Sequence, residues 1–298
     1  MKPFDVRVVH FFQRWMDRYL HFRRGATPDD RWLANFKKGN ESFEIEYKEL
    51  RLKLYKDSLV CKFIFDSFEE AEVLFTRRFL KSGDRFIDAG ANIGLFALNA
   101  SVCVGETGHV YAFEPTPVTF NRLKENVALN QLHNLTLESL GLSDKNELLN
   151  LHMSLSGYDA WNSFAPVSPV GETINAEVPV VAIDTYIENK CIKDIALIKI
   201  DVEGWEMYVL KGASNLLSSS CSPVLMVEFT EENAFAAGFY CGEIFDFVRS
   251  FGYEWYQYNA SANTLELQKK KLHYPYENLI AIKDLKKVMI RLKDEVNL

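Results

Sequence analysis

The residues best suited to chemistry lie in the sequence DAGANIG, which runs from Asp88 to Gly94. A short apolar run over 85–89 comes before it and an apolar helical segment follows, so we predict a turn between a strand and a helix. Gly90 and Gly94 allow the backbone to approach a ligand closely, and the start of the helix offers unpaired N–H groups to an anion. The stretch therefore predicts a ligand site at the end of a strand.

An acid ends the next expected strand, which covers 109–114 and finishes at Glu114. Its separation of about 20 residues from Gly94 is typical of an acid that binds ribose hydroxyl groups. Asn92 stands where the dinucleotide fingerprint G-x-G-x-x-G has its second glycine, which a pyrophosphate requires. A ligand with a carboxylate and a ribose but no phosphate fits better, and S-adenosylmethionine is such a ligand. The alternative is a strand–helix turn that binds nothing.

Two later strands also end in acids, since Asp201 follows 195–200 and Glu228 lies within 223–229. The carboxyl ends of central strands face the ligand crevice of a doubly wound sheet, so we expect Asp201 near the donor and Glu228 near the acceptor. Asp201 could instead cap the next helix, and Glu203 could be a first-turn acid favoured by the helix dipole. Glu228 could pair with a basic residue, bind a substrate hydroxyl or share a metal with Asp201. We favour hydrogen bonding and predict no metal site.

A sulfonium methyl donor sets a limited task for the protein. Transfer is a direct displacement, so the protein must mainly align the nucleophile, the methyl carbon and the sulfur, which can be worth about 7–11 kcal/mol. An alcohol nucleophile also benefits from a general base. The candidates for that base are Asp201, Glu203, Glu228 and His152.

Two further regions are expected to border the ligand. The adenine should lie at the end of the third strand, near Glu138, Ser139 and Leu140. The insertion that follows contains Tyr158 and Trp161, which could stack on a sugar or close over the cofactor, or could pack on the domain instead.

Strands and helices alternate from position 85 onward, which predicts a mostly parallel sheet that positions these residues. The expected strands cover 85–89, 109–114, 135–140, 195–200, 223–229, 253–258 and 278–283. An insertion over 141–182 should add two more strands, 148–155 and 177–183.

An accessory segment comes before the sheet. Residues 7–24 have apolar residues at helical spacing with arginines on the other side, which predicts an amphipathic helix. That helix could pack on the domain or on a partner subunit, or lie weakly on an anionic membrane surface. Alternating residues over 43–54, continued by 59–65, predict an antiparallel hairpin, and 68–80 follows a helical period.

Composition limits the class of protein. The chain has 298 residues, of which 48% are hydrophobic, enough for one large α/β domain and an accessory segment. A net charge of −7 disfavours nucleic acid as a partner. The five cysteines are scattered and lack C-x-x-C spacing, so we expect thiols in a reducing compartment. With no run of 18 apolar residues, a soluble cytoplasmic protein is expected.

Five motifs occur together in one known family: DAGANIG at 88–94, FEP at 113–115, LSD at 142–144, KIDVEG at 199–204 and VLKGA at 209–213. With Glu228 one strand later, the chain resembles the FkbM-type methyltransferases over about residues 83–258. The resemblance implies a class I methyltransferase fold, an α/β Rossmann-like sheet of seven strands in the order 3-2-1-4-5-7-6. It also implies S-adenosylmethionine as the donor and O-methylation, often of sugar or polyketide hydroxyls.

We therefore expect an accessory segment over 1–82, a methyltransferase domain over 83–284 and a charged tail over 285–298. The leading hypothesis is an O-methyltransferase acting on a saccharide or small metabolite. One alternative is an N-methyltransferase of a small amine, although the Asn/Asp-Pro-Pro-Tyr motif of base methylation is absent after the fourth strand. The other is a cofactor-binding interaction protein without catalysis, although Asp201 and Glu114 are intact. The oligomeric state stays open.

Overall fold

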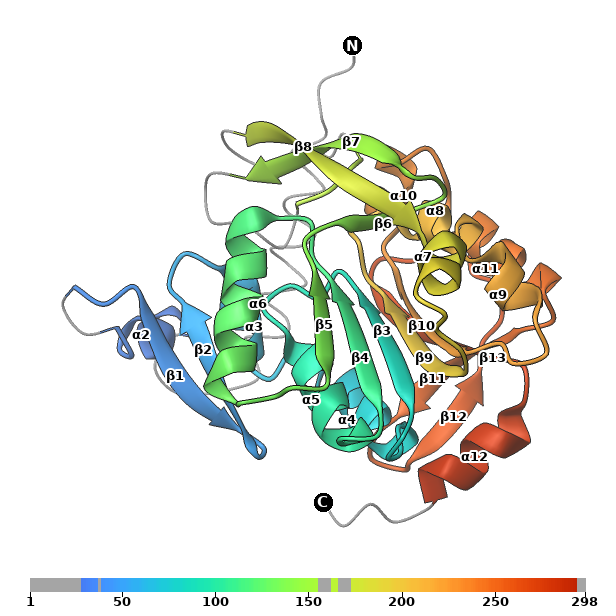
Figure 1. Ribbon diagram of the computed structural model, residues 1–298, viewed down its shortest axis with the longest axis horizontal. Coiled ribbons are helices and arrows are strands. Elements are labelled where there is room, and N and C mark those ends of the chain that lie inside the picture. The colour runs from blue at the N-terminus through green and yellow to red at the C-terminus, as the bar shows by residue number, and fades with distance from the viewer. Residues whose placement is uncertain (1–27, 37–38, 155–161, 166–172, 294–298) are drawn as a thin grey trace.

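The structure is a computed structural model that describes residues 28–36, 39–154, 162–165 and 173–293 (Figure 1). At its centre lies an eight-stranded sheet with the strand order β12-β11-β13-β10-β9-β3-β4-β5. The bounds of these strands are β3 Arg85–Ala89, β4 His109–Phe113, β5 Leu135–Glu138, β9 Ile195–Ile200, β10 Val224–Phe229, β11 Glu254–Asn259, β12 Thr264–Leu267 and β13 Glu277–Ile282.

The strand directions identify the fold. Strands β5, β4, β3, β9 and β10 pair in parallel, whereas β13 runs antiparallel to both β10 and β11. This is the order 3-2-1-4-5-7-6 of a class I methyltransferase fold, so the predicted architecture is confirmed. One strand exceeds the expected seven, because β12 pairs antiparallel with β11 at the edge of the sheet.

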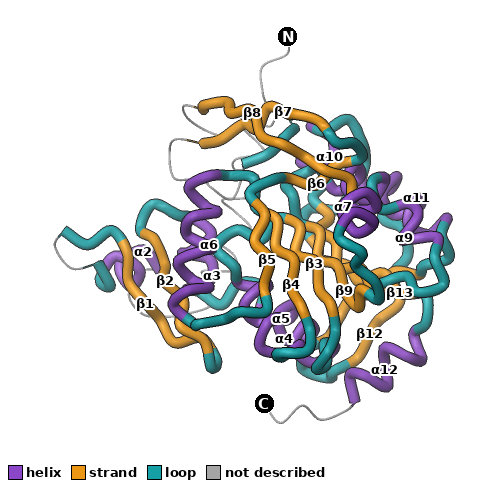
Figure 2. The backbone as a smooth tube through the Cα atoms, viewed as in Figure 1, coloured by secondary structure: helices purple, strands orange, loops and turns teal. Residues whose placement is uncertain are grey.

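Helices cover both faces of the sheet (Figure 2). Alternate residues of one strand face opposite sides of the sheet. In β3, Phe86 therefore belongs to one core cluster and Ile87 to the other. One face carries α4 Glu70–Phe79, α5 Leu95–Val104, α6 Pro117–Leu129 and α12 Leu285–Lys293. The other face carries α7 Ile183–Asn189, α8 Glu206–Lys211, α9 Ser214–Ser218, α10 Glu231–Ala236 and α11 Cys241–Ser250. None of the helices in the described ranges is long and apolar enough to cross a bilayer.

The accessory segment contains α2 Pro28–Leu33, the hairpin β1 Ser42–Tyr47 and β2 Leu50–Tyr55, and α3 Leu59–Phe65. The hairpin is confirmed, but its predicted continuation over 59–65 is wrong. Those residues form α3 because Ser58 caps the helix, where its Oγ accepts a hydrogen bond from the Cys61 N–H at 3.1 Å. The amphipathic helix expected over 7–24 lies outside the described residues.

Two segments add to the expected plan. The insertion forms a separate three-stranded sheet of β6 Gly141–Ser143, β8 Thr173–Ala182 and β7 Glu147–Ser154, which lies above the carboxyl ends of the parallel strands (Figure 1). Two of its strands match the prediction. Within the segment assigned to a charged tail, residues 285–293 form α12, whose Val288 and Leu292 are buried in the core.

Candidate active site

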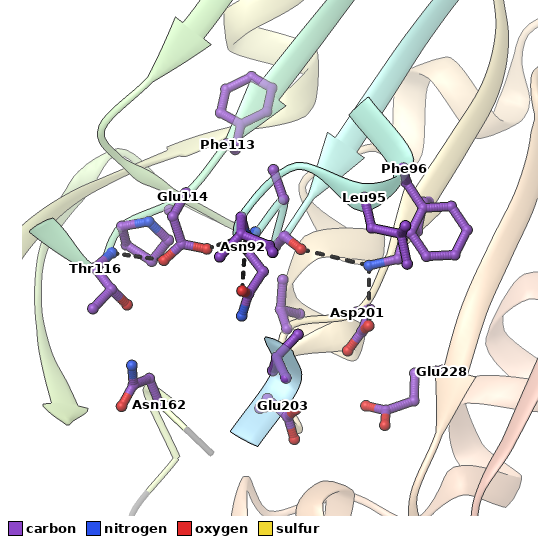
Figure 3. A pocket seen from close by; sticks show the side chains of 18 of the residues that line it. Asn92, Leu95, Phe96, Phe113, Glu114, Thr116, Asn162, Asp201, Glu203 and Glu228 are labelled. Atoms are coloured by element: carbon purple, nitrogen blue, oxygen red, sulfur yellow. Dashed lines mark hydrogen bonds and ion pairs between the residues drawn. The ribbon is translucent and has the colours of Figure 1, made fainter. Parts of the chain in front are cut away.

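A cavity lies where the chain leaves β3, β4, β9 and β10, at the carboxyl edge of the sheet (Figure 3). Six predicted site residues line it: Gly90, Asn92, Glu114, Asp201, Glu203 and Glu228. Five other predicted site residues do not: Asp88, Gly94, Glu138, Ser139 and Leu140. We call the part formed by Gly90, Ala91, Asn92, Glu114 and Thr116 the turn side. We call the part formed by Glu69, Asp201, Glu203 and Glu228 the acid side.

Backbone hydrogen bonds hold Glu114 on the turn side. Its Oε2 accepts from the Asn92 N–H at 3.0 Å, and its Oε1 accepts from the Thr116 N–H at 2.9 Å (Figure 3). Asn92 has a φ of 49°, a left-handed conformation that asparagine tolerates, and its Oδ1 accepts from the Ile93 N–H at 2.8 Å. The two residues singled out from sequence therefore fix each other at the end of β4.

The two glycines of the turn are explained by packing. Gly90 has a φ of 80°, and a Cβ there would lie 1.9 Å from the backbone oxygen of Asp201. Gly94 has a φ of 100°, and its Cβ would lie 2.4 Å from Leu98 Cδ1 and 2.7 Å from Leu123 Cδ1. Gly90 thus lets the turn touch the end of β9, whereas Gly94, which does not line the cavity, lets α5 begin beside α6.

A buried lysine at the end of β9 connects the acids of two strands. The Lys199 side chain is 5% exposed, and its Nζ lies 3.0 Å from Asp201 Oδ2 and 3.9 Å from Asp88 Oδ1. Burial lowers the pKa of Lys199, but the Asp201 and Asp88 carboxylates outweigh that effect and raise it above its ordinary range. Burial raises the pKa of Asp88 to about 6, against the attraction of Lys199. Asp88 is therefore buried and does not line the cavity, but it lies beside Lys199, a lining residue that was not predicted as part of the site.

Three carboxylates converge on the acid side. Asp201, Glu203 and Glu228 each place an oxygen within 4.8 Å of the others, and all three face the same space in Figure 3. Burial, and then the nearby charge of Asp201, raise the pKa of Glu203 and of Glu228 well above the usual range. Glu203 Oε2 accepts from Asn233 Nδ2 at 2.7 Å, and Glu228 Oε1 accepts from the Thr230 hydroxyl at 3.1 Å. Such a group can hold a shared proton or a cation.

The turn after β9 is held by a different acid from the one proposed as its cap. Glu206 Oε1 accepts from the Val202 N–H at 3.1 Å and from the Gly204 N–H at 3.0 Å. Its pKa is raised to about 7 by burial, which these backbone hydrogen bonds partly offset. Asp201 is thereby released from that structural role, and its carboxylate pairs with Lys199 at the cavity surface.

The acid side also contains residues that sequence patterns did not indicate. Glu69, in the turn before α4, has a φ of 57° and lines the cavity. Its Oε1 accepts from the Tyr276 hydroxyl at 3.0 Å and from Asn278 Nδ2 at 2.9 Å. Burial, together with the charge of Asp201, raises the pKa of Glu69 to about 7. No sequence signal marks these hydrogen bonds, because Glu69 lies more than 200 positions from both Tyr276 and Asn278 and none of the three belongs to a motif.

The insertion lines part of the cavity, but His152 is not among its lining residues. That imidazole bonds to Asn175 Oδ1 on the neighbouring strand at 2.9 Å and does not line the cavity. Asn162 and Phe164 line it instead, and the Phe164 ring packs on Trp205 with centroids 5.7 Å apart. The predicted stacking residues Tyr158 and Trp161 lie outside the described residues.

The three residues predicted to lie near adenine do not line the cavity. Glu138 Oε1 accepts from the Tyr186 hydroxyl at 2.8 Å, which turns this carboxylate toward α7. The neighbouring residues Gly141 and Leu142 line the cavity in its place. That adenine lies near Glu138, Ser139 and Leu140 stays a prediction.

Comparison with known proteins gives the family. Residues 88–255 match the methyltransferase FkbM domain, which is more than half of the chain. The hexuronic acid methyltransferase AglP of Haloferax volcanii is 30% identical over 54% of this chain and 57% of its own length. The 31-O-demethyl-FK506 methyltransferase FkbM of Streptomyces tacrolimicus is 32% identical over 46% of this chain and 62% of its own length. The chain thus spans less than two thirds of either relative.

Solved structures resemble this chain only distantly. A SAM-dependent O-methyltransferase from Thermotoga maritima matches with a TM-score of 0.40 at 14% identity, over 82% of this chain and 78% of its own. A precorrin-6y C5,15-methyltransferase from Geobacter metallireducens matches with a TM-score of 0.41 at 14% identity, over 72% of this chain and 88% of its own. The fold assignment therefore depends on the strand order, and the family assignment on the sequence match. By that match, the chain belongs to the FkbM methyltransferase domain family.

Proposed function

We propose that this protein transfers a methyl group from S-adenosylmethionine to a hydroxyl group of a saccharide or small metabolite. The observation that carries the proposal is the cavity, where Glu114 and Asp201 lie at the ends of β4 and β9 on either side of the Gly90–Asn92 turn. Family membership supports methyl transfer, and two relatives are named as methyltransferases of a hexuronic acid and of 31-O-demethyl-FK506.

The turn side, together with the neighbouring Asp201, offers the chemical groups that S-adenosylmethionine needs for binding. The Glu114 carboxylate, fixed by two backbone N–H groups, has the chemistry to accept hydrogen bonds from ribose hydroxyls. The backbone of the turn and the adjoining helix start favour a carboxylate, and Asp201 favours the ammonium group of the same ligand. We keep Glu138, Ser139 and Leu140 as the proposed adenine neighbours, with Gly141 and Leu142 as the lining residues beside them.

The acid side supplies the proposed base. Proton transfer is most efficient when the pKa of the catalytic group is close to the working pH, and burial raises the pKa values of Glu203 and Glu228 in that direction. We propose that Glu228 accepts the proton of the acceptor hydroxyl and that Glu203 supports this proton transfer. Asp201 stabilises the cationic donor, which loses its positive sulfur charge as the methyl group leaves.

Catalysis is proposed to proceed without a metal ion, although three carboxylates could bind one. We expect that a chelator leaves turnover unchanged. We also propose that residues 83–284 act as the methyltransferase domain and that residues 1–82 are accessory to it.

Calorimetry with S-adenosylhomocysteine tests the donor site. We expect binding, and we expect Glu114→Ala to weaken it by about 1–3 kcal/mol through the loss of hydrogen bonds to a charged acceptor. Glu106→Ala, which removes an exposed acid, is the matched control. Unchanged affinity in a folded Glu114→Ala protein would contradict the donor assignment. Binding without transfer of a labelled methyl group to any hydroxylated acceptor would favour the non-catalytic alternative.

A further inference from the structure

The cavity combines residues from inside and outside the family match. The turn side, Asp201, Glu203 and Glu228 all lie within residues 88–255. Another wall comes from outside that range and consists of Val60, Phe63, Ile64, Phe68, Glu69 and Tyr276. A donor common to a family is expected to be bound by the shared residues, which leaves the second wall to contact the acceptor.

We propose that Glu69 determines acceptor specificity and selects a sugar unit that is neutral or bears an amino group over one that bears a carboxylate. This inference rests on the proposed function and names its substrate class. Glu69 is contributed by the accessory segment, which thereby becomes part of the acceptor site.

Glu69 is held in place by neighbours on two sides. Tyr276 and Asn278 both donate to its Oε1, which orients the carboxylate toward the cavity lining. The preceding Phe68 packs against the Tyr276 ring with centroids 5.7 Å apart and against Phe63 with centroids 5.3 Å apart. The wall therefore offers flat apolar surface next to a hydrogen-bond acceptor, which suits a ring with apolar faces and hydroxyl edges.

The charges that line the cavity decide which acceptors are favoured. Among the lining residues that the structure describes, Lys199 is the only basic one, and it already forms ion pairs with Asp201 and Asp88. Glu69, Glu203 and Glu228 face the remaining space, and no ion pair joins any of them to a basic residue in the described part of the chain. Above pH 7, where the Glu69 carboxyl with its pKa of about 7 is ionised, a carboxylate on the acceptor would add a like charge beside it, whereas hydroxyl or ammonium groups would donate to it.

Three matched acceptors test the inference: methyl glucoside, methyl glucosaminide and methyl glucuronide. Transfer from methyl-labelled S-adenosylmethionine is measured with each one. We expect kcat/KM for the neutral and amino sugars to exceed that for the uronic acid by at least about tenfold, because a like charge a few ångströms away costs more than 1.4 kcal/mol. Glu69→Gln should reduce this ratio by about tenfold, and Glu69→Lys should favour the uronic acid. Glu46→Gln, an equal charge change on an exposed position of β1, should leave the ratio unchanged.

Several results would overturn the inference. These are a uronic acid preferred by the natural protein, a ratio unaffected by Glu69→Gln, or no transfer to any of the three sugars by a protein that binds S-adenosylhomocysteine. Absence of S-adenosylhomocysteine binding would instead contradict the proposed function, and the inference would fall with it. Should Glu69→Gln not fold, Tyr276→Phe removes one hydrogen bond to Glu69 while keeping the ring, and it should shift the ratio in the same direction by a smaller factor.

Discussion

The turn side and the acid side of the cavity are built in opposite ways. On the turn side, backbone N–H groups hold one carboxylate, Glu114, and every contributor lies within 30 positions of Asp88. On the acid side, four carboxylates from three segments face one another, and burial raises the pKa values of Glu69, Glu203 and Glu228. A local motif can build the first kind of site, whereas the second exists only when distant segments are packed together.

The largest expected effect concerns Lys199, which keeps the buried acids compatible with folding. Lys199→Met should destabilise the protein by about 3–5 kcal/mol, because it leaves Asp88 as a buried charge without a partner. Denaturant unfolding measures the change, and Asp88→Asn in the same protein should restore much of the loss. Lys145→Met, at an exposed position, is the control. A loss below about 1 kcal/mol would mean that Asp88 is protonated in the natural protein.

Asp201→Asn tests whether the acid side acts on the reaction. The substitution preserves shape but removes the negative charge beside the cationic donor, so kcat should fall by about 10²–10³-fold. Turnover with labelled donor measures it, and Asp246→Asn, at a surface ion pair with Lys270, serves as control. Near-normal turnover would show that the catalytic face lies elsewhere.

The buried acids at the carboxyl edge of the sheet also predict how stability depends on pH. Asp88 has a pKa raised to about 6, and Glu69 and Glu206 have values raised to about 7. Between about pH 4 and pH 7 the folded protein then holds protons that the unfolded chain has released, so stability falls as pH rises through this window. We expect a higher Tm at pH 5.5 than at pH 7.5 in the absence of ligand. Equal values at both pH settings would argue that the acid side is open to solvent.

The smallest expected effect comes from the N-terminal segment. Removal of residues 1–24 should leave S-adenosylhomocysteine affinity unchanged, because the residues of the turn side begin at Gly90. Calorimetry on the folded truncated protein measures this. Weakened binding would make the segment part of the donor site.

The sequence alone determined the sheet and half of the cavity. Strands that alternate with helices form a parallel sheet, and parallel strands present their carboxyl ends at one edge, so Glu114, Asp201 and Glu228 had to converge. The strand order and the family were both predictable from the same motifs. Local rules suffice for the alternation of strands and helices, which depends on neighbours in the chain, whereas the strand order followed from the resemblance to the family.

Only the tertiary structure decided the rest. The hydrogen bond from Tyr276 to Glu69 joins residues 207 positions apart, and no periodicity relates them. The sequence also could not tell which acid holds the turn after β9, since Asp201 and Glu206 both lie close to it. Only their packing shows that Glu206 binds the backbone of the turn and that Asp201 lines the cavity. The raised pKa values likewise depend on burial among segments distant in the chain, a quantity that no stretch of sequence contains.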